Sequence, residues 1–311
     1  MWFDRLRQTG LMGLGRRAGR VLLERSSAQA ELWSKRLMHA EAWARVPAEQ
    51  RDLLSRNRTF ENRHRGERAF VLANGPSLAQ QNIDHLAAET TFCCNSFFRH
   101  PEVKWEATYY LVTDGVWFED NDECKAALRD LCDRQQRAQL FAPVQYHDVI
   151  RQYDLLPESR TFYMAIDGFL RESLYPDVDL TRLVLSPPTV VQTSILAALY
   201  MGCSPIYLLG FDHNWLQDPT RFDHFHPGNT IGAERGTHVG DPLWQTYGTL
   251  TEYVNTIWRA YESVRKIAKR RNVEIINATQ GGFLDLFPRC NYDALFAVEE
   301  KTDREIRSSG G

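Results

Sequence analysis

The amino-acid sequence predicts an α/β protein with a mostly parallel β-sheet covered by helices on both faces. From residue 68 onward, short apolar runs alternate with helical stretches, a pattern typical of parallel strands joined by helices. The apolar runs lie at 69–73, 90–94, 107–112, 139–142, 161–165, 183–186, 205–209 and 273–276. The helical stretches that separate several of them lie at 79–87, 122–137, 190–201 and 246–271.

The composition is that of an ordinary globular protein. The chain has 311 residues, of which 43% are hydrophobic and 25% charged, and its net charge of −3 gives no general attraction to nucleic acid. No run approaches the roughly 18 apolar residues of a membrane span, and no secretory signal is evident. We expect a cytoplasmic protein with reduced core thiols, because no CxxC pair occurs. The cysteines are Cys93, Cys94, Cys124, Cys132, Cys203 and Cys290.

The first 66 residues are predicted to be a basic helical extension, with helix over 28–56. Residues 1–25 carry six arginines against two acidic residues, interleaved with apolar and aromatic side chains. Such a segment can lie on the anionic inner face of the cytoplasmic membrane. The alternative is a helix packed on the domain or on another subunit of a homo-oligomer. The predicted division is 1–66, the α/β domain at 67–300 and a disordered tail at 301–311.

The first apolar run ends in Asn74-Gly75-Pro76-Ser77, residues that interrupt a strand. In open parallel sheets, ligands bind beyond the carboxyl ends of the strands. Glycine allows a ligand to approach the backbone, and the start of the following helix leaves N–H groups for an anion. The stretch lacks both the GxGxxG fingerprint and the lysine of a P-loop. A plain turn is the alternative interpretation.

The next two predicted strands also end in polar residues. Asn95 follows the second strand, where its side-chain amide could read a base or a sugar, or could cap a helix. Thr113 and Asp114 follow the third strand and could equally form a turn.

A longer stretch, from Pro187 to Trp215, is predicted to form a helix and then a strand. Thr189 begins the helix and Gln192 lies in its first turn. The strand ends in Gly210, Phe211, Asp212, His213 and Asn214. We expect the start of the helix and the end of the strand to face one crevice.

The segment 215–242 is rich in helix-breaking residues and holds three histidines, His224, His226 and His238. Imidazole suits general-base chemistry at neutral pH, and a loop of this length is more often a functional lid than filler. A surface loop is the alternative for each histidine. We expect no metal site here or at the two Asp-Xaa-Asp triplets, Asp120–Asp122 and Asp177–Asp179, which do not sit at strand ends.

Four motifs, "LANGPSL", "CCNSFF", "TYYLVTDGVWFED" and "LYMGCSPIYLLGFD", follow the order found in bacterial sialyltransferases of glycosyltransferase family 42, which the chain distantly resembles. It more closely resembles a bacterial family of polysaccharide-cluster proteins that are often labelled as similar to 6-hydroxymethylpterin diphosphokinase. That resemblance extends to "NRHRGERAFVLANGPSL" and "NATQGGFLDLFPR" and covers roughly residues 57 to 296. The N-terminal 56 residues lie outside both.

The family 42 resemblance implies a Rossmann-like variant of the GT-A fold and a metal-independent transferase that uses a CMP-activated nonulosonic acid. Thr113 falls where the family has asparagine and Asn214 where it has a phosphate-binding tyrosine, and Val190 and Val191 replace Ser and Gly after Thr189. The residues implied to bind the nucleotide sugar are Asn74, Gly75, Ser77, Asn95, Thr113, Asp114, Thr189, Gln192, Gly210, Asp212 and Asn214. The implied base is His238, with His224 second.

Three functions follow from these observations. The first is a glycosyltransferase without a cofactor that uses a histidine base to move a sugar such as sialic acid or Kdo onto a glycan or lipid-linked glycan of capsule or lipopolysaccharide. The second is a pterin pyrophosphokinase that uses ATP and magnesium, for which Asp114 and Asp212 are the metal-binding candidates. The third is a non-catalytic nucleotide-binding protein.

Overall fold

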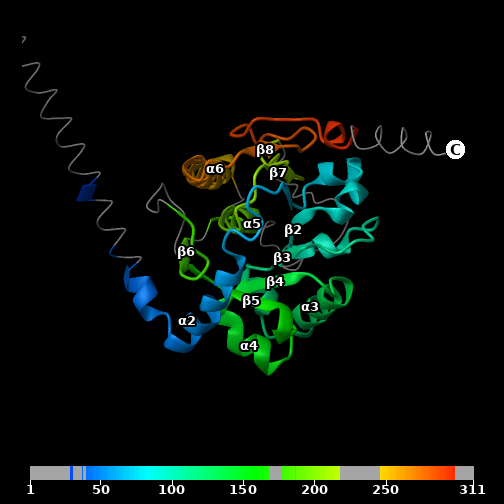
Figure 1. Cartoon of the computed structure of the whole chain (residues 1–311). Helices are drawn as coiled ribbons and strands as arrows, with labels where there is room; N and C mark the ends of the chain where they lie inside the picture. The colour runs from blue at the N-terminus through cyan, green and yellow to red at the C-terminus, as the bar shows by residue number, and fades with distance from the viewer. Residues whose placement is uncertain are drawn as a thin grey trace, which may run out of the picture. The chain divides into compact units, whose positions relative to one another are not determined.

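The computed structural model describes residues 29, 30, 37, 40–167, 177–185, 187–217 and 246–297. The chain forms two compact units, Met1–Val46 and Pro47–Gly311, and the second carries the sheet (Figure 1). The sequence-based division at residue 66 therefore falls inside the second unit. The basic segment 1–25 and the tail 301–311 lie outside the described residues.

The described residues form one sheet of eight strands in which every pair of neighbours is parallel (Figure 1). The strands are β1 (Ala69–Leu72), β2 (Thr90–Cys94), β3 (Tyr109–Leu111), β4 (Gln139–Pro143), β5 (Thr161–Asp167), β6 (Leu183–Leu185), β7 (Ile206–Leu209) and β8 (Ile275–Asn277). All eight predicted strands are confirmed. They were recognisable because a parallel sheet is buried on both faces, so its strands are continuous apolar runs.

The described helices cover both faces of the sheet, which confirms the predicted fold class; α3 and α5 lie on opposite sides (Figure 1). The α-helices are α2 (Ala48–Ser55), α3 (Asp122–Arg134), α4 (His147–Gln152), α5 (Val190–Tyr200) and α6 (Tyr247–Arg270). The short 3₁₀ helices are η1 (Arg56–Phe60), η2 (Pro76–Gln80), η3 (Ile83–Ala88), η4 (Asn95–Arg99), η5 (Gly115–Phe118), η6 (Val144–Tyr146), η7 (Glu158–Arg160) and η9 (Asp293–Leu295).

The helix expected at 79–87 is instead two 3₁₀ segments, η2 and η3. Gln81 adopts an extended backbone between them, and its side-chain amide donates to the Ala278 carbonyl at 2.9 Å. The Asn82 side chain then accepts a hydrogen bond from the Asp84 N–H, which caps η3. A contact with a residue almost 200 positions away thus outweighs the local preference for one helix.

The chain reverses direction across the sheet between β1 and β7. Strands β1 to β6 follow one another to one side, and α5 then returns the chain to β7, which pairs with the other edge of β1; the full order is β6-β5-β4-β3-β2-β1-β7-β8. The connections that leave β1 and β7 therefore run in opposite directions. Such a switch point is where open parallel sheets bind ligands.

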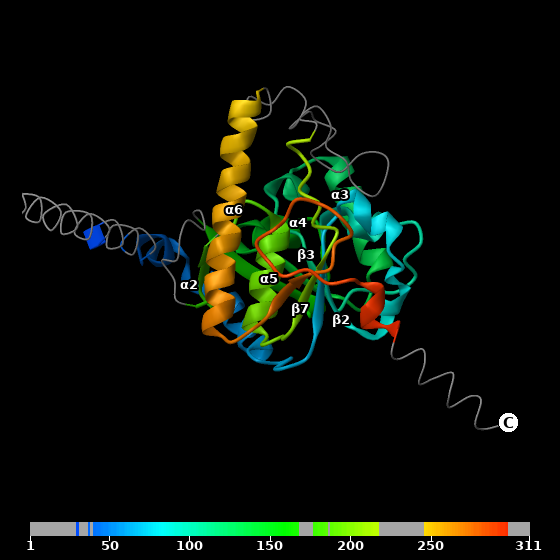
Figure 2. The same ribbon diagram turned by 90° about the horizontal axis from the view of Figure 1, so that it is seen from above.

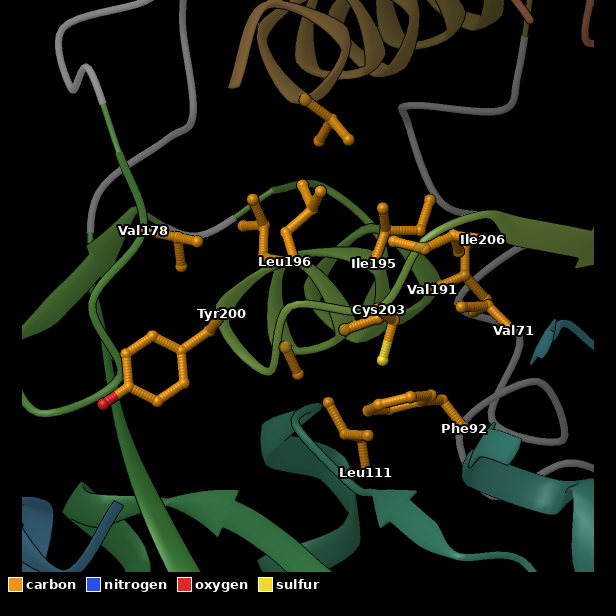
Figure 3. Close-up of a cluster of buried hydrophobic side chains, with 14 of the residues drawn as sticks. Val71, Phe92, Leu111, Val178, Val191, Ile195, Leu196, Tyr200, Cys203 and Ile206 are labelled. Atoms are coloured by element: carbon orange, nitrogen blue, oxygen red, sulfur yellow. The ribbon is translucent and has the colours of Figure 1, made fainter. Parts of the chain in front are cut away.

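Helices α5 and α6 lie side by side over one face of the sheet (Figure 2). Every residue of α5 from Val191 to Tyr200 is buried, because the helix lies between the sheet and α6. Ile195 and Leu196 of α5 pack in one cluster with Val71, Phe92 and Leu111 of the strands (Figure 3). This apolar layer fixes the start of α5 near the carboxyl ends of β1 and β7.

Residues 47–60 pack on the far part of the sheet. The buried Asn57 side chain donates to the carbonyls of Tyr163 in β5 and Leu180 before β6, both at 2.7 Å. The Phe60 ring contacts Phe162 and Phe141 with centroids 4.5 and 5.3 Å apart. Asn57 thus ties β5 to the segment that leads into β6.

Candidate functional site

The candidate site lies at the switch point, where the chain continues the β1–β7 pairing past the ends of both strands. The N–H of Ala73 donates to the Leu209 carbonyl at 2.9 Å, and the N–H of Gly75 donates to the Gly210 carbonyl at 3.0 Å. Two groups of predicted site residues that are more than 130 positions apart in the sequence are therefore neighbours.

Gly75 is required here by a contact within the protein. A Cβ at this position would lie 1.9 Å from Asp212 Oδ2 and 2.3 Å from the Gly210 carbonyl oxygen. Gly210 itself has φ +72°, a backbone conformation that favours glycine. The side of Gly75 on which a Cβ would lie is filled by the Asp212 carboxylate, and the approach of a ligand to this backbone stays a prediction.

The Asp212 carboxylate binds the start of η2. Asp212 Oδ1 accepts from the Ser77 N–H at 3.2 Å, and Oδ2 accepts from the Ser77 hydroxyl at 2.7 Å. Burial raises the pKa of Asp212, and the two hydrogen bonds from Ser77 oppose that shift. The N–H predicted to meet a ligand phosphate therefore already donates to a carboxylate of the protein.

A third segment, which follows β8, also binds the loop that follows β7. The Phe283 N–H donates to the Asp212 carbonyl at 2.8 Å, and the Thr279 hydroxyl accepts from the Phe211 N–H at 3.0 Å. Arg289 closes this segment by donating to the carbonyls of Thr279 and Gly281. Thr279, Phe283 and Arg289 were not predicted from the sequence to belong to the site, although they lie in the motif "NATQGGFLDLFPR".

The Asn74 side chain, after β1, reaches the backbone at the end of β2, just before Asn95. Asn74 is 9% exposed, and its Nδ2 lies 3.5 Å from the Cys94 carbonyl oxygen. Asn95 has φ +47°, and its carbonyl accepts from the Tyr110 hydroxyl at 2.6 Å. Asn95 makes no side-chain cap for η4, and its buried Oδ1 has no hydrogen-bond partner in the described part of the chain. Tyr110 therefore holds the backbone of Asn95, while the side chain carries an unused acceptor.

Thr113 and Asp114 follow β3, which lies two strands away from β1. Asp114 is exposed and its Oδ1 accepts from the Val116 N–H at 3.2 Å, which caps η5. Thr113 is half-buried. The turn that the sequence allowed at this position is present.

His213, next to Asp212, lies inside the protein. It has φ +46°, is 7% exposed, and its Nε2 lies 2.7 Å from the Tyr261 hydroxyl of α6. Burial lowers the pKa of His213 to about 3, so the imidazole is neutral at physiological pH. Four aromatic rings surround it at centroid distances of 4.7 to 6.0 Å: Phe211, Trp215, Trp258 and Tyr261.

The two candidates on α5 use their polar atoms within the protein. The Thr189 hydroxyl donates to Gln192 Oε1 at 3.1 Å, and Gln192 Nε2 donates to the Ile257 carbonyl of α6 at 2.9 Å. Gln192 is fully buried. On the β7 loop, Asn214 is half-buried and its carbonyl accepts from the Gln217 N–H at 2.9 Å.

The predicted bases His238 and His224, together with His226, lie outside the described residues. Across the described ranges, no three or more His, Cys, Asp or Glu side chains are grouped so that they could hold a metal ion. Within the same ranges, no helix is long and apolar enough to cross a membrane.

Solved structures with a similar chain arrangement share little sequence with this protein. The sialyltransferase CstII from Campylobacter jejuni, in complex with the substrate analogue CMP-3FNeuAc, is 12% identical with a TM-score of 0.45, over 72% of this chain and 86% of that chain. The monofunctional alpha-2,3-sialyltransferase Cst-I from the same organism is 14% identical with a TM-score of 0.45, over 78% and 96%. At these values the likeness concerns the chain arrangement and carries nothing about activity. No protein-family model and no curated protein matches the chain.

Gly75→Ala tests the close packing at the switch point. The added Cβ would overlap Asp212 Oδ2, so we expect the free energy of unfolding to fall by about 1–3 kcal/mol. Urea unfolding measures this change. Gly248→Ala in the first turn of α6 is the control, because a Cβ there meets no atom closer than 3.5 Å. Equal stability of the two variants would contradict the close contact.

Asp212→Asn tests the buried charge through the pH dependence of stability. Because burial raises the folded-state pKa above 3.8, the folded protein binds the proton more tightly than the unfolded chain does. The wild type should therefore lose stability, relative to the Asn variant, as the pH rises from 3.8 through the raised pKa. Unfolding free energies of both proteins between pH 3.5 and 8 (roughly the useful range for carboxyl titration) measure the difference. A difference that does not change with pH, or that changes in the opposite direction, would be evidence against this account.

Proposed function

We propose that the protein is a glycosyltransferase that moves a sugar from a CMP-activated donor, such as a nonulosonic acid, onto a glycan acceptor. One observation carries the proposal. The motifs after β1, β2 and β7, which share their order with family 42 transferases, come together at the switch point of the sheet. A ligand site at this position is what the topology favours.

Side-chain amides are the groups best suited to contact the donor at this edge. Asn74, Asn95 and Asn214 follow three strands, β1, β2 and β7, that lie side by side. An amide offers both donors and an acceptor, which suits the edge of a cytosine base or a sugar hydroxyl. The Oδ1 of Asn95 has no partner among the described residues, so it can accept a hydrogen bond without breaking one. Thr113 and Asp114 extend the same row after β3.

The proposed reaction is a single displacement. An acceptor hydroxyl attacks the anomeric carbon, the bond from that carbon to the phosphate oxygen breaks, and CMP leaves with the bonding electrons. A histidine takes the hydroxyl proton. His213 does not suit this role, because burial lowers its pKa to about 3 and its Nε2 is bound to Tyr261. We therefore assign the base to His238, with His224 second, as the family resemblance implies.

The pyrophosphokinase alternative receives no support from the two candidate metal ligands. Both carboxylate oxygens of Asp212 are hydrogen-bonded to Ser77, and Asp114 lies after β3, where it caps η5. The surface-glycan substrates, membrane contact through residues 1–25 and homo-oligomer formation depend on the sequence alone and remain predictions.

The first experiment is a thermal-shift screen with CMP, CDP, UDP, GDP and ATP, each with and without magnesium. A ligand that binds the folded state raises the melting temperature by mass action. We expect a shift with CMP or CDP that does not depend on magnesium. Stabilisation by UDP or GDP would keep the transferase and change its donor. A shift with ATP alone that requires magnesium would favour the pyrophosphokinase.

His238→Ala tests the assignment of the base. We expect turnover to fall by a factor of about 10²–10⁴, the usual contribution of a general base, while the thermal shift with CMP is retained. Transfer of sugar from a CMP-linked donor is measured, with His226→Ala as a control in the same segment and His224→Ala as the second candidate. Unchanged turnover in His238→Ala would remove this residue from the mechanism.

A further inference from the structure

Four polar side chains near the candidate site link helices α5 and α6 to the loop that follows β7, which we call the β7 loop. Gln192 and Thr189 lie at the start of α5, Tyr261 lies on α6, and His213 lies on the loop. The Thr189 hydroxyl donates to Gln192 Oε1 at 3.1 Å. The same hydroxyl lies close enough to the Tyr261 hydroxyl to influence the pKa of Tyr261. The Tyr261 hydroxyl in turn lies 2.7 Å from His213 Nε2.

Gln192 fixes the position of Tyr261 along α6. Its Nε2 donates to the Ile257 carbonyl, one turn before Tyr261, at 2.9 Å. Gln192 is fully buried, and both the oxygen and the nitrogen of its amide are hydrogen-bonded within the protein. It therefore has no polar atom available to a nucleotide-sugar ligand. Gln192 thus connects the start of α5 to α6.

The loop needs such an anchor because its backbone is strained. His213 has φ +46°, a left-handed conformation that a residue with a Cβ rarely adopts. The hydrogen bond to Tyr261 and the surrounding aromatic rings hold the imidazole inside the protein. The direction of the chain at His213 also sets where its neighbours Asp212 and Asn214 lie.

We infer that His213, Tyr261 and Gln192 are positioning residues, which hold the β7 loop in the conformation that binds the donor. This inference rests on the proposed function, because it assigns a role in the same site. The hydrogen bond between Tyr261 and His213 is its central element. Without that bond, the strained loop is expected to populate other backbone conformations at residues 212–214.

Tyr261→Phe tests the inference, because it removes one hydroxyl and keeps the ring. We expect CMP to bind about 3- to 10-fold more weakly, the usual value of one lost hydrogen bond. The matched control is Tyr200→Phe: Tyr200 is a buried tyrosine of α5 whose hydroxyl has no hydrogen-bond partner in the described ranges. It should bind CMP as the wild type does. His213→Asn, which tolerates the left-handed backbone, should weaken binding at least as much as Tyr261→Phe.

Two measurements separate a positioning role from general destabilisation. Calorimetry gives the dissociation constant for CMP, and ¹⁵N spectra of the imidazole report the tautomer of His213. In the wild type we expect one tautomer, fixed by the bond to Tyr261, and in Tyr261→Phe a mixture of both. The Tyr200→Phe spectrum should match the wild type.

The outcomes distinguish this inference from the proposed function. If the wild type does not bind CMP or another nucleotide, the proposed function fails. If the wild type binds CMP and Tyr261→Phe binds it equally well, only the inference fails. The inference also fails if affinity falls in Tyr261→Phe while the His213 spectrum stays unchanged, because the loss would then not act through His213.

Discussion

The candidate site depends on the position of one carboxylate, that of Asp212. The end of β7 places it against the turn that follows β1, where it accepts two hydrogen bonds from Ser77. The backbone of the same residue is bound by the segment after β8, through the N–H of Phe283. Three segments that are distant in sequence therefore meet at one residue. Gly75 and Gly282 are both needed there, because a Cβ at either position would overlap Asp212.

This arrangement places a negative charge inside the protein at an energetic cost. Burial raises the pKa of Asp212, and the groups that directly bind its oxygens are the hydroxyl and N–H of Ser77. Arg289 lowers the pKa only through its charge, while its own hydrogen bonds go to backbone carbonyls. A carboxylate whose desolvation is incompletely offset by its partners is typical of functional sites. A core that served stability alone would be expected to hold an apolar residue at this position.

The sequence was sufficient to predict the strands and the long helices, because these depend on local apolar patterns. It also predicted which loops come together, since strand ends in a parallel sheet meet at one edge. It could not predict the contacts that Gly75 and Gln192 make within the protein, because their partners, Asp212 and Ile257, lie 137 and 65 positions away. Tyr261 was not predicted as a site residue, because the pattern of an amphipathic helix does not distinguish a buried tyrosine from the other core residues.

The structure divides the predicted site residues into two groups by what their polar atoms already do. The first group has polar atoms that are already hydrogen-bonded within the protein and so hold the site together: Asp212, Ser77 and Gln192. Asn95 keeps an acceptor that no described residue uses. A group bonded within the protein must break that bond before it can bind a ligand, whereas an unused acceptor gains one. Under the proposed function, Asn95 is therefore the residue from which we expect a direct contact to the sugar donor, and we expect the buried network to govern the shape of the loop after β7.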